Sequence, residues 1–84
     1  MPKRVRPADW PKIHRDLSQR ISELRCSREL SQEALADAAG ISRRGLQNLE
    51  NAETTPGIDH LILVARALDT TVIDLLKGID GFDE

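Results

Sequence analysis

The sequence predicts an all-α domain of five helices, and three observations support this fold class. Apolar residues recur every three or four positions in successive segments, which is the spacing of helices with one buried face. The 84 residues include one Trp, one Phe and no Tyr, so aliphatic side chains that suit close-packed helices must form the core. Ser and Gly residues stand where these segments begin and end. The length fits a single domain.

The first helix is expected from Trp10 to about Arg28. Asp9 precedes it in a capping position, and Pro11 lies in its first turn, where proline is tolerated. The apolar residues of its inner face follow at steps of four, four and three, namely Ile13, Leu17, Ile21 and Leu24.

Two short helices are expected next, joined by a tight turn. The first spans Gln32 to Ala39, with Ser31 as its N-cap and Gly40 at its end. The second begins at Ser42 and extends to Asn51. The apolar residues expected to face inward are Leu35, Ala38 and Ala39 in the first helix and Leu46 and Leu49 in the second.

A loop and two further helices complete the predicted domain. Residues 52–57 have turn composition and no apolar periodicity. A fourth helix is expected from Ile58 to Leu68, with an inner face formed by Ile58, Leu61, Ile62, Ala65 and Leu68. A fifth helix is expected from Val72 to Lys77, and Gly78 ends it.

The charge of the chain is strongly polarised along its length. Residues 1–49 hold 10 Lys and Arg against 6 Asp and Glu, whereas residues 50–84 hold 2 against 8. A basic half can neutralise phosphates while an acidic half faces away from DNA or meets a protein partner. Together with the predicted helices, this charge distribution divides the chain into a flexible basic arm (residues 1–9), a domain (residues 10–78) and an acidic tail (residues 79–84).

The segment from Leu30 to Ala52, LSQEALADAAGISRRGLQNLENA, resembles the helix-turn-helix of the Xre family, which includes phage repressors and Cro proteins. Counted from Gln32, the fifth residue is small, the ninth is glycine, and the tenth, fifteenth and eighteenth are apolar, namely Ala36, Gly40, Ile41, Leu46 and Leu49. Helix crossing, a left-handed turn and helix packing require these residue types. The resemblance covers roughly residues 17–76 and implies a five-helix, phage-repressor-like DNA-binding domain.

The resemblance implies that residues 42–51 are a recognition helix lying in the major groove. The side chains expected to contact bases are Arg43, Arg44, Gln47 and Asn48. Those expected to contact the DNA backbone are Gln32, Ser42, Asn51, Thr54 and Thr55, together with Lys3, Arg4 and Arg6 of the arm. In the family, the residue at the position of Gln32 often bonds a phosphate and braces a recognition-helix side chain. Ala52, Glu53 and Thr54 replace the usual glycine and basic residues, which weakens the expected phosphate clamp.

Three further residues are expected to have structural roles. By the resemblance, Arg25 and Glu50 match an ion pair that links the first helix to the recognition helix. Glu29 stands where the family commonly has glycine, so the turn there is expected to be strained or differently shaped. Cys26, the only cysteine, is expected to be a small buried side chain without a disulfide.

The function expected from these features is sequence-specific binding of double-stranded DNA by a transcriptional regulator. We expect a homodimeric repressor on an inverted-repeat operator, with a dimer contact formed by Val72, Ile73, Leu76, Ile79 and Phe82. One alternative is an antitoxin or another protein-binding module whose partner is a toxin or polymerase. Another is a restriction-modification controller, which has the same size and domain.

Enzyme, metal and membrane functions are not expected. His14 and His60 lie on different predicted helices without zinc-ligand spacing, no glycine-rich phosphate loop is present, and Cys26 has no evident base partner. No cofactor is expected. The longest apolar run, Leu61 to Ala65, is far too short for a membrane span. The expected location is the cytoplasm of a bacterium, for a bacterial or phage-encoded protein that joins the nucleoid when bound to DNA.

Overall fold

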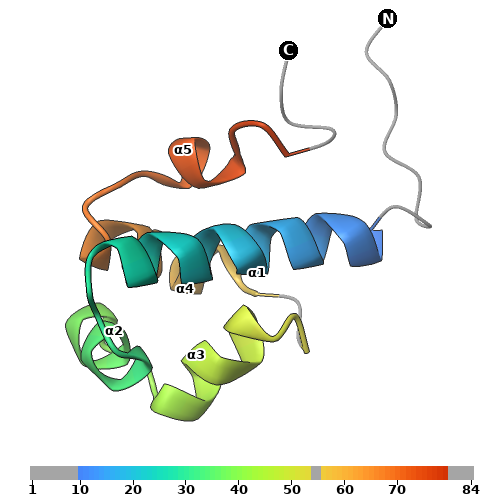
Figure 1. Cartoon of the computed structure of the whole chain (residues 1–84). Coiled ribbons are helices and arrows are strands. Elements are labelled where there is room, and N and C mark those ends of the chain that lie inside the picture. The colour runs from blue at the N-terminus through green and yellow to red at the C-terminus, as the bar shows by residue number, and fades with distance from the viewer. Residues whose placement is uncertain (1–9, 54–55, 80–84) are drawn as a thin grey trace, which may run out of the picture.

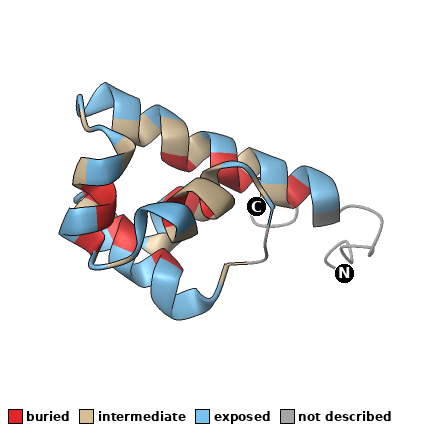
Figure 2. Cartoon of the chain, turned by 90° about the horizontal axis from the view of Figure 1, so that it is seen from below, coloured by how far each residue is buried: buried red, intermediate tan, exposed pale blue. Residues whose placement is uncertain are grey.

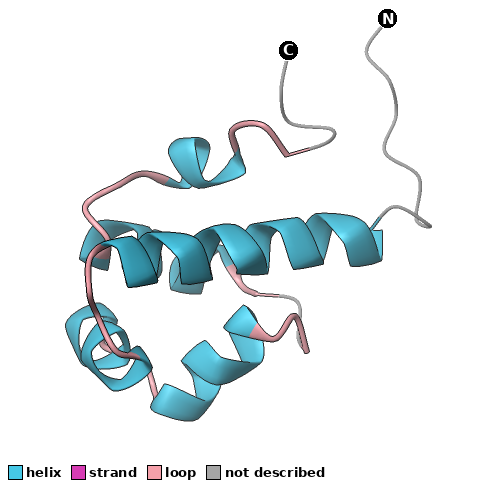
Figure 3. Ribbon diagram, viewed as in Figure 1, coloured by secondary structure: helices cyan, strands magenta, loops and turns pink. Residues whose placement is uncertain are grey.

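The structure, a computed structural model, describes residues 10–53 and 56–79. These residues form five helices and no strand (Figure 3). The helices are α1 (Trp10–Ser27), α2 (Gln32–Ala39), α3 (Arg43–Glu50), α4 (Ile58–Ala67) and α5 (Val72–Leu76). The predicted all-α fold is confirmed, and each predicted helix end lies within one residue of the observed one. None of these described helices is both long enough and apolar enough to cross a membrane.

The long helix α1 divides the domain (Figure 1). It packs against α3 on one side and against α5 on the other, while α2 packs against both α3 and α4, and α4 packs against α5. The pair formed by α2 and α3 lies together on one side of α1. The inner side of α3 packs against α1 and α2, and its outer side contacts no other described helix.

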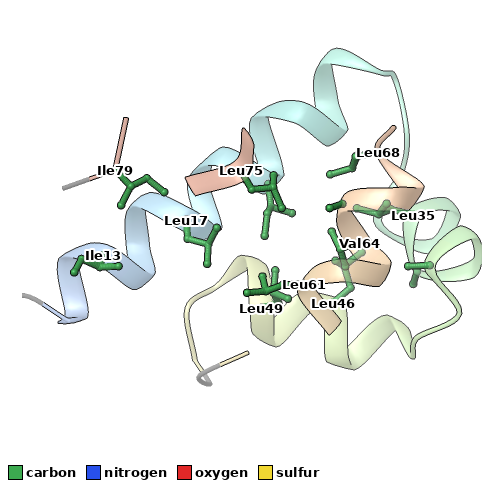
Figure 4. Close-up of a cluster of buried hydrophobic side chains, with 14 residues drawn as sticks. Ile13, Leu17, Leu35, Leu46, Leu49, Leu61, Val64, Leu68, Leu75 and Ile79 are labelled. Atoms are coloured by element: carbon green, nitrogen blue, oxygen red, sulfur yellow. The ribbon is translucent and has the colours of Figure 1, made fainter. Parts of the chain in front are cut away.

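One hydrophobic core joins all five helices (Figure 4). Its buried residues are Ile13, Leu17, Ile21, Leu35, Ala36, Ala39, Leu46, Leu49, Leu61, Val64, Ala65, Leu68, Leu75 and Ile79. Each helix turns one face to this cluster and leaves its other side exposed (Figure 2). The described helices are thus held together by aliphatic packing, as the near absence of aromatic residues predicts.

The inner faces predicted for α2 and α4 are partly wrong. In α4, Ile58 and Ile62 are 64% and 42% exposed, and Val64 is fully buried in their place. In α2, Ala38 is exposed and Ala36 is buried. Both helices have apolar residues on more than one side, so periodicity alone does not indicate which stripe packs against the neighbouring helices.

The helix ends follow from local hydrogen bonds. The side-chain oxygens of Ser31, Ser42 and Thr71 each accept a hydrogen bond from the backbone N–H three residues later, at 3.0, 2.9 and 3.1 Å. These bonds satisfy N–H groups that have no partner within the helix, which explains where α2, α3 and α5 begin. Gly40 ends α2 with a φ of 73°, a left-handed conformation that favours glycine.

The turn after α1 contains a non-glycine residue in a left-handed conformation, because Glu29 has a φ of 56°. The expectation of a strained turn at Glu29 is thereby confirmed. Cys26, just before this turn, is exposed, so the expectation that it is buried is wrong. It lies on the outer side of the last turn of α1, away from the core.

Replacement of Glu29 by glycine is expected to stabilise the domain. Because Glu29 is exposed and left-handed, Glu29→Gly removes backbone strain without loss of packing, and the free energy of unfolding should rise by about 1 kcal/mol. Gly40→Ala is the matched control. An added Cβ there meets nothing within 4 Å, so only the backbone conformation at φ 73° is penalised and stability should fall by about the same amount. Urea denaturation measures both changes, and a Glu29→Gly variant no more stable than the parent would contradict the prediction.

Candidate nucleic-acid interface

The unit formed by α2, the Gly40 turn and α3 has a rigid inner side. Leu46 is fully buried and Leu49 is 4% exposed, so α3 is anchored along one stripe. Ala36 is 1% exposed, and its carbonyl accepts a hydrogen bond from the Ile41 N–H at 3.0 Å across the turn. A small residue at this position lets the chain pass close to α2. The orientation of α3 is therefore set by the core.

The outer side of α3 displays the side chains predicted to contact bases. Arg43 and Arg44 are exposed, and Gln47 and Asn48 are half-buried. Neither arginine has a hydrogen-bond or salt-bridge partner among residues 10–53 and 56–79, so both guanidinium groups are available to a ligand. Arginine has five N–H donors in a planar arrangement suited to guanine or phosphate. The Ser42 oxygen accepts the cap bond from Gly45, which leaves its hydroxyl proton available as a donor.

A partly buried ion pair connects the C-terminal end of α3 to α1. The Glu50 carboxylate accepts from Arg25 Nε at 2.9 Å and Nη2 at 3.1 Å, and from the Ser22 hydroxyl at 2.7 Å. The Arg25 and Glu50 side chains are 16% and 3% exposed. A further bond from Arg25 Nη1 to the Leu30 carbonyl, at 2.8 Å, adds the loop before α2. The ion pair implied by the family resemblance is present and joins three segments of the chain.

The arginine of this pair keeps its charge at physiological pH. The hydrogen bond to Glu50 raises the pKa of Arg25 above its ordinary value, against the opposing effect of partial burial. Because the pKa is raised in the folded state, the stabilisation is fully present below the ordinary arginine pKa and is lost only as the pH rises through the folded value. The pair therefore constrains α3 throughout the neutral range.

Gln32 links this pair to the outer side of α3. Its Nε2 donates to Glu50 Oε1 at 3.3 Å, and its Oε1 accepts from Gln47 Nε2 at 3.5 Å. The expectation that Gln32 braces a recognition-helix side chain is confirmed for Gln47. Its contact with a phosphate stays a prediction.

Two serines of α1 were not identified from the sequence. Ser18 is buried, and its hydroxyl donates to the Leu49 carbonyl at 2.6 Å, while Ser22 donates to Glu50. Residues 18, 22 and 25 recur at helical spacing and so share one face of α1. That polar stripe beside the apolar one was the available signal for a contact with α3.

The segment after α3 follows a left-handed turn at Ala52, where φ is 56°. The backbone N–H of Asn51 donates to Gln47 at 2.9 Å, and that of Glu53 donates to Asn48 at the same distance. The Asn51 side chain is left exposed at the end of the helix. The other residues predicted to contact the DNA backbone, namely Thr54, Thr55, Lys3, Arg4 and Arg6, lie outside the described residues.

The predicted dimer surface requires a correction. Ile79 is 2% exposed and belongs to the domain's own core, because Gly78, with a φ of 83°, turns the chain back after α5. Figure 4 shows Ile79 beside the part of the core lined by α1. Val72 and Leu76 are half-buried against the same core, and Ile73 is 79% exposed. Phe82 lies outside the described residues.

The described part of the chain contains no candidate metal site. No group of three or more His, Cys, Asp or Glu side chains within residues 10–53 and 56–79 is placed to hold a metal ion. The two histidines lie on separate helices, His14 on α1 and His60 on α4.

Comparison with known proteins shows that this chain is similar to helix-turn-helix regulators. A family model described as helix-turn-helix matches residues 21–75. The chain is 37% identical over 68 residues to the HTH-type transcriptional regulator DdrOP3 of Deinococcus deserti, which covers 81% of this chain and 53% of that protein. It is 35% identical over 60 residues to the control protein C.SmaI of Serratia marcescens, which covers 71% of each.

A solved structure has the same fold. The restriction-modification controller protein C.AhdI from Aeromonas hydrophila aligns with a TM-score of 0.71 at 31% identity, covering 73% of this chain and 92% of that one. The chain spans about half the length of the curated relatives from Deinococcus and Rickettsia that it matches.

Proposed function

Because the chain belongs to the Xre family of helix-turn-helix transcriptional regulators, we propose that it binds a specific double-stranded DNA sequence and regulates transcription from it, as a repressor. Membership in a family of regulators confirms the prediction that the domain is not an enzyme. A repressor acts where its DNA is, so the proposal also places the protein in the bacterial cytoplasm, bound to the nucleoid.

The observation that supports sequence-specific binding best is the contrast between the two sides of α3. Its inner side is anchored by Leu46 and Leu49, whereas its first turn displays Arg43 and Arg44 without partners among the described residues. A rigid helix with unpaired, exposed donors is what recognition of base edges in a major groove requires. We propose that α3 enters the groove with this turn foremost.

The remaining polar residues divide between bases and backbone in the proposal. Gln47 and Asn48, one turn further along α3, are the other candidates for base contacts. Contacts with the DNA backbone are assigned to side chains at the two ends of the helix-turn-helix and in the arm, namely Gln32, Ser42, Asn51, Thr54, Thr55, Lys3, Arg4 and Arg6. Such contacts set the position on DNA without reading its sequence.

We further propose that two copies bind an inverted repeat. Ile73 is 79% exposed on α5, and a second copy would cover this side chain together with the half-buried Val72 and Leu76. Two recognition helices related by a two-fold axis would enter successive major grooves about 34 Å apart. A dimer held at such a site would block access of polymerase to an overlapping promoter.

A narrower function, control of a restriction-modification system, is the second candidate. It is supported by the similarity to C.SmaI and C.AhdI, because the aligned region covers 71% of C.SmaI and 92% of C.AhdI. The genes beside this one distinguish the candidates, because a methyltransferase or endonuclease gene indicates a controller. A small toxin-like gene would instead favour the antitoxin alternative, in which the main partner is a protein.

Selection from random duplex DNA tests the proposal. At about 150 mM salt, where non-specific phosphate binding is weak, the protein should enrich an inverted repeat. Arg43→Ala and Arg44→Ala should each lower affinity for that repeat by about tenfold or more, since a good base contact is worth about 1 to 3 kcal/mol.

Arg66→Ala is the matched control for these variants, because it removes the same charge from an exposed position on α4. It should leave the enriched sequence unchanged. A single half-site in place of a repeat would contradict the dimer. Binding that depends on salt alone, with no enriched sequence, would contradict base reading and make isolation of a protein partner the next step.

A further inference from the structure

The outer side of α4 exposes an apolar surface to solvent. Ile58 and Ile62 are 64% and 42% exposed, and because they are four residues apart they lie one above the other on the same side of the helix. The buried residues of α4, namely Leu61, Val64 and Ala65, anchor its other side. Neither isoleucine belongs to the core of the domain. Adjacent exposed apolar side chains on one helix indicate a surface that a partner covers.

Two opposite charges flank this surface along the helix. Asp59 lies in the first turn of α4 and Arg66 in its last turn, and both are exposed. They are seven residues apart, so they differ by only about 20° in direction around the helix axis, and Ile62 lies near the midpoint between them. Within the described part of the chain neither has a salt-bridge partner. Both charges are therefore available to a partner molecule.

This arrangement is complementary to itself under a two-fold rotation. If two α4 helices pack antiparallel about an axis beside Ile62, Asp59 of each copy faces Arg66 of the other, and two ion pairs form. Ile62 then packs against its own counterpart, and Ile58 packs against the methylene stem of the opposite Arg66. An interface between identical copies related by a two-fold axis requires a patch that complements itself in this way.

We infer that α4 forms the two-fold contact of the dimer, and that its partner is α4 of a second copy of this chain in antiparallel orientation. This inference rests on the proposed function and specifies the surface through which the two copies meet. The dimer proposed above covers Ile73 of α5, and α5 packs against α4, so the new contact extends that surface. A parallel pair of α4 helices would put Asp59 against Asp59 and Arg66 against Arg66.

The apolar side chains and the charges contribute differently to this contact. Burial of Ile58 and Ile62 provides most of the attraction, because exposed ion pairs contribute little by themselves. Like charges held face to face in an interface are strongly unfavourable, so the charges select the orientation. Arg66→Ala removes a charge without adding repulsion. It should keep the inverted repeat and weaken the association of the two copies by no more than about tenfold.

Cooperative binding to the selected inverted repeat tests the inference. For each protein, the affinity for the whole repeat is compared with the affinity for an isolated half-site, so that differences in the contact with DNA cancel. Asp59→Arg and Arg66→Asp should each lower the cooperativity by about 30-fold or more, since each puts like charges face to face twice. The double variant exchanges the two charges and should regain most of the cooperativity. An equal mixture of the two single variants should regain it as well.

This exchange separates an intermolecular role from a purely structural one. Asp59 and Arg66 also suit the dipole of α4, because acidic residues are favourable near the N-terminus of a helix and basic residues near its C-terminus. Melting curves of the variants measure that cost. A structural role alone makes the double variant the least stable and the least cooperative protein. A double variant and a mixture that are as uncooperative as the single variants would overturn the inference.

A second pair of variants leaves the charges at the two ends of α4 unchanged. Ile62→Lys puts two lysines beside the two-fold axis and should abolish cooperativity. His60→Lys is the matched control, because it adds the same charge at an exposed position on the opposite side of α4. Its cooperativity should stay within about threefold of the wild type, since exposed charges that far apart are largely screened. Equal cooperativity in the two variants would contradict the contact through α4.

The wild type and one variant of α5 distinguish failure of the inference from failure of the proposed function. Ile73→Ser removes the exposed apolar side chain of α5. If it abolishes cooperativity while Asp59→Arg and Arg66→Asp do not, the dimer forms through α5 alone, which overturns the inference and leaves the proposed function standing. Independent binding of two copies of the wild type, or selection of a single half-site, overturns the proposed dimer and the inference with it.

Discussion

Glu50→Ala is expected to lower the free energy of unfolding by about 3 to 5 kcal/mol, because it leaves the Arg25 guanidinium largely buried without its counter-charge. Arg25 is 16% exposed, and three of its hydrogen bonds hold it between α1, α3 and the loop before α2. Two of those three end on Glu50. The substitution also removes the acceptor of Ser22 and Gln32.

A loss of this size is a large part of the stability of so small a domain. At about 0.1 kcal/mol per residue, 84 residues give on the order of 8 kcal/mol. Each kcal/mol shifts the melting temperature of such a domain by about 4 to 8 °C, so thermal unfolding followed by circular dichroism should show a fall of more than about 10 °C. A melting temperature equal to that of the wild type would refute the prediction.

The double variant Arg25→Met with Glu50→Met is the control. Removing both charges leaves no uncompensated ion, and two apolar side chains of similar length fill the same space, so most of the lost stability should return. Recovery would show that the isolated charge causes the damage. Equal loss in the single and double variants would instead point to packing around residue 50.

Leu46→Ala is expected to lower the free energy of unfolding by about 2 to 5 kcal/mol, because it opens a cavity beneath α3. Leu46 is fully buried and packs where α3 meets α2 and the rest of the core. Chemical denaturation should show the loss as a lower midpoint with an unchanged slope, since the surface exposed on unfolding is nearly the same.

Leu63→Ala is the matched control, because the same atoms are removed from a side chain that is 39% exposed on α4. Its cost should be under about 1.5 kcal/mol, because a substantial part of this side chain is already in contact with solvent and its loss leaves no closed cavity. A Leu46→Ala variant no less stable than Leu63→Ala would contradict the core position of Leu46. At low temperature, where the folded fraction is high, Leu46→Ala should still select the same DNA sequence as the wild type.

These two sites hold α3 in different ways. Leu46 anchors the middle of the helix by apolar packing, and Glu50 ties its last residue to α1 through directional bonds. Packing sets how close the helix lies to the core, whereas directional bonds also limit its rotation. A side chain such as Gln47, between the two, is therefore presented to a ligand in a defined direction.

The sequence by itself determined where the helices begin and end, because the responsible interactions are local. Ser31 and Ser42 bond to N–H groups three residues away, and Gly40 adopts the left-handed conformation that stops α2. The same local spacing identified the helix-turn-helix and, through it, the exposed arginines of α3. The Arg25–Glu50 pair was also predictable, but only from resemblance to the family, since the two residues are 25 positions apart.

Only the tertiary structure decided which apolar residues are buried and which polar side chains meet. The α4 sequence is apolar on several sides, so the burial of Val64 in place of Ile58 depends on where its neighbours pack. Ile79 enters the core because the chain turns at Gly78. The link from Glu50 through Gln32 to Gln47 joins α2 to the second turn of α3, and it depends on a carboxylate that folding removes from water. Contacts between distant segments have no local signature, because their geometry exists only once the helices have packed.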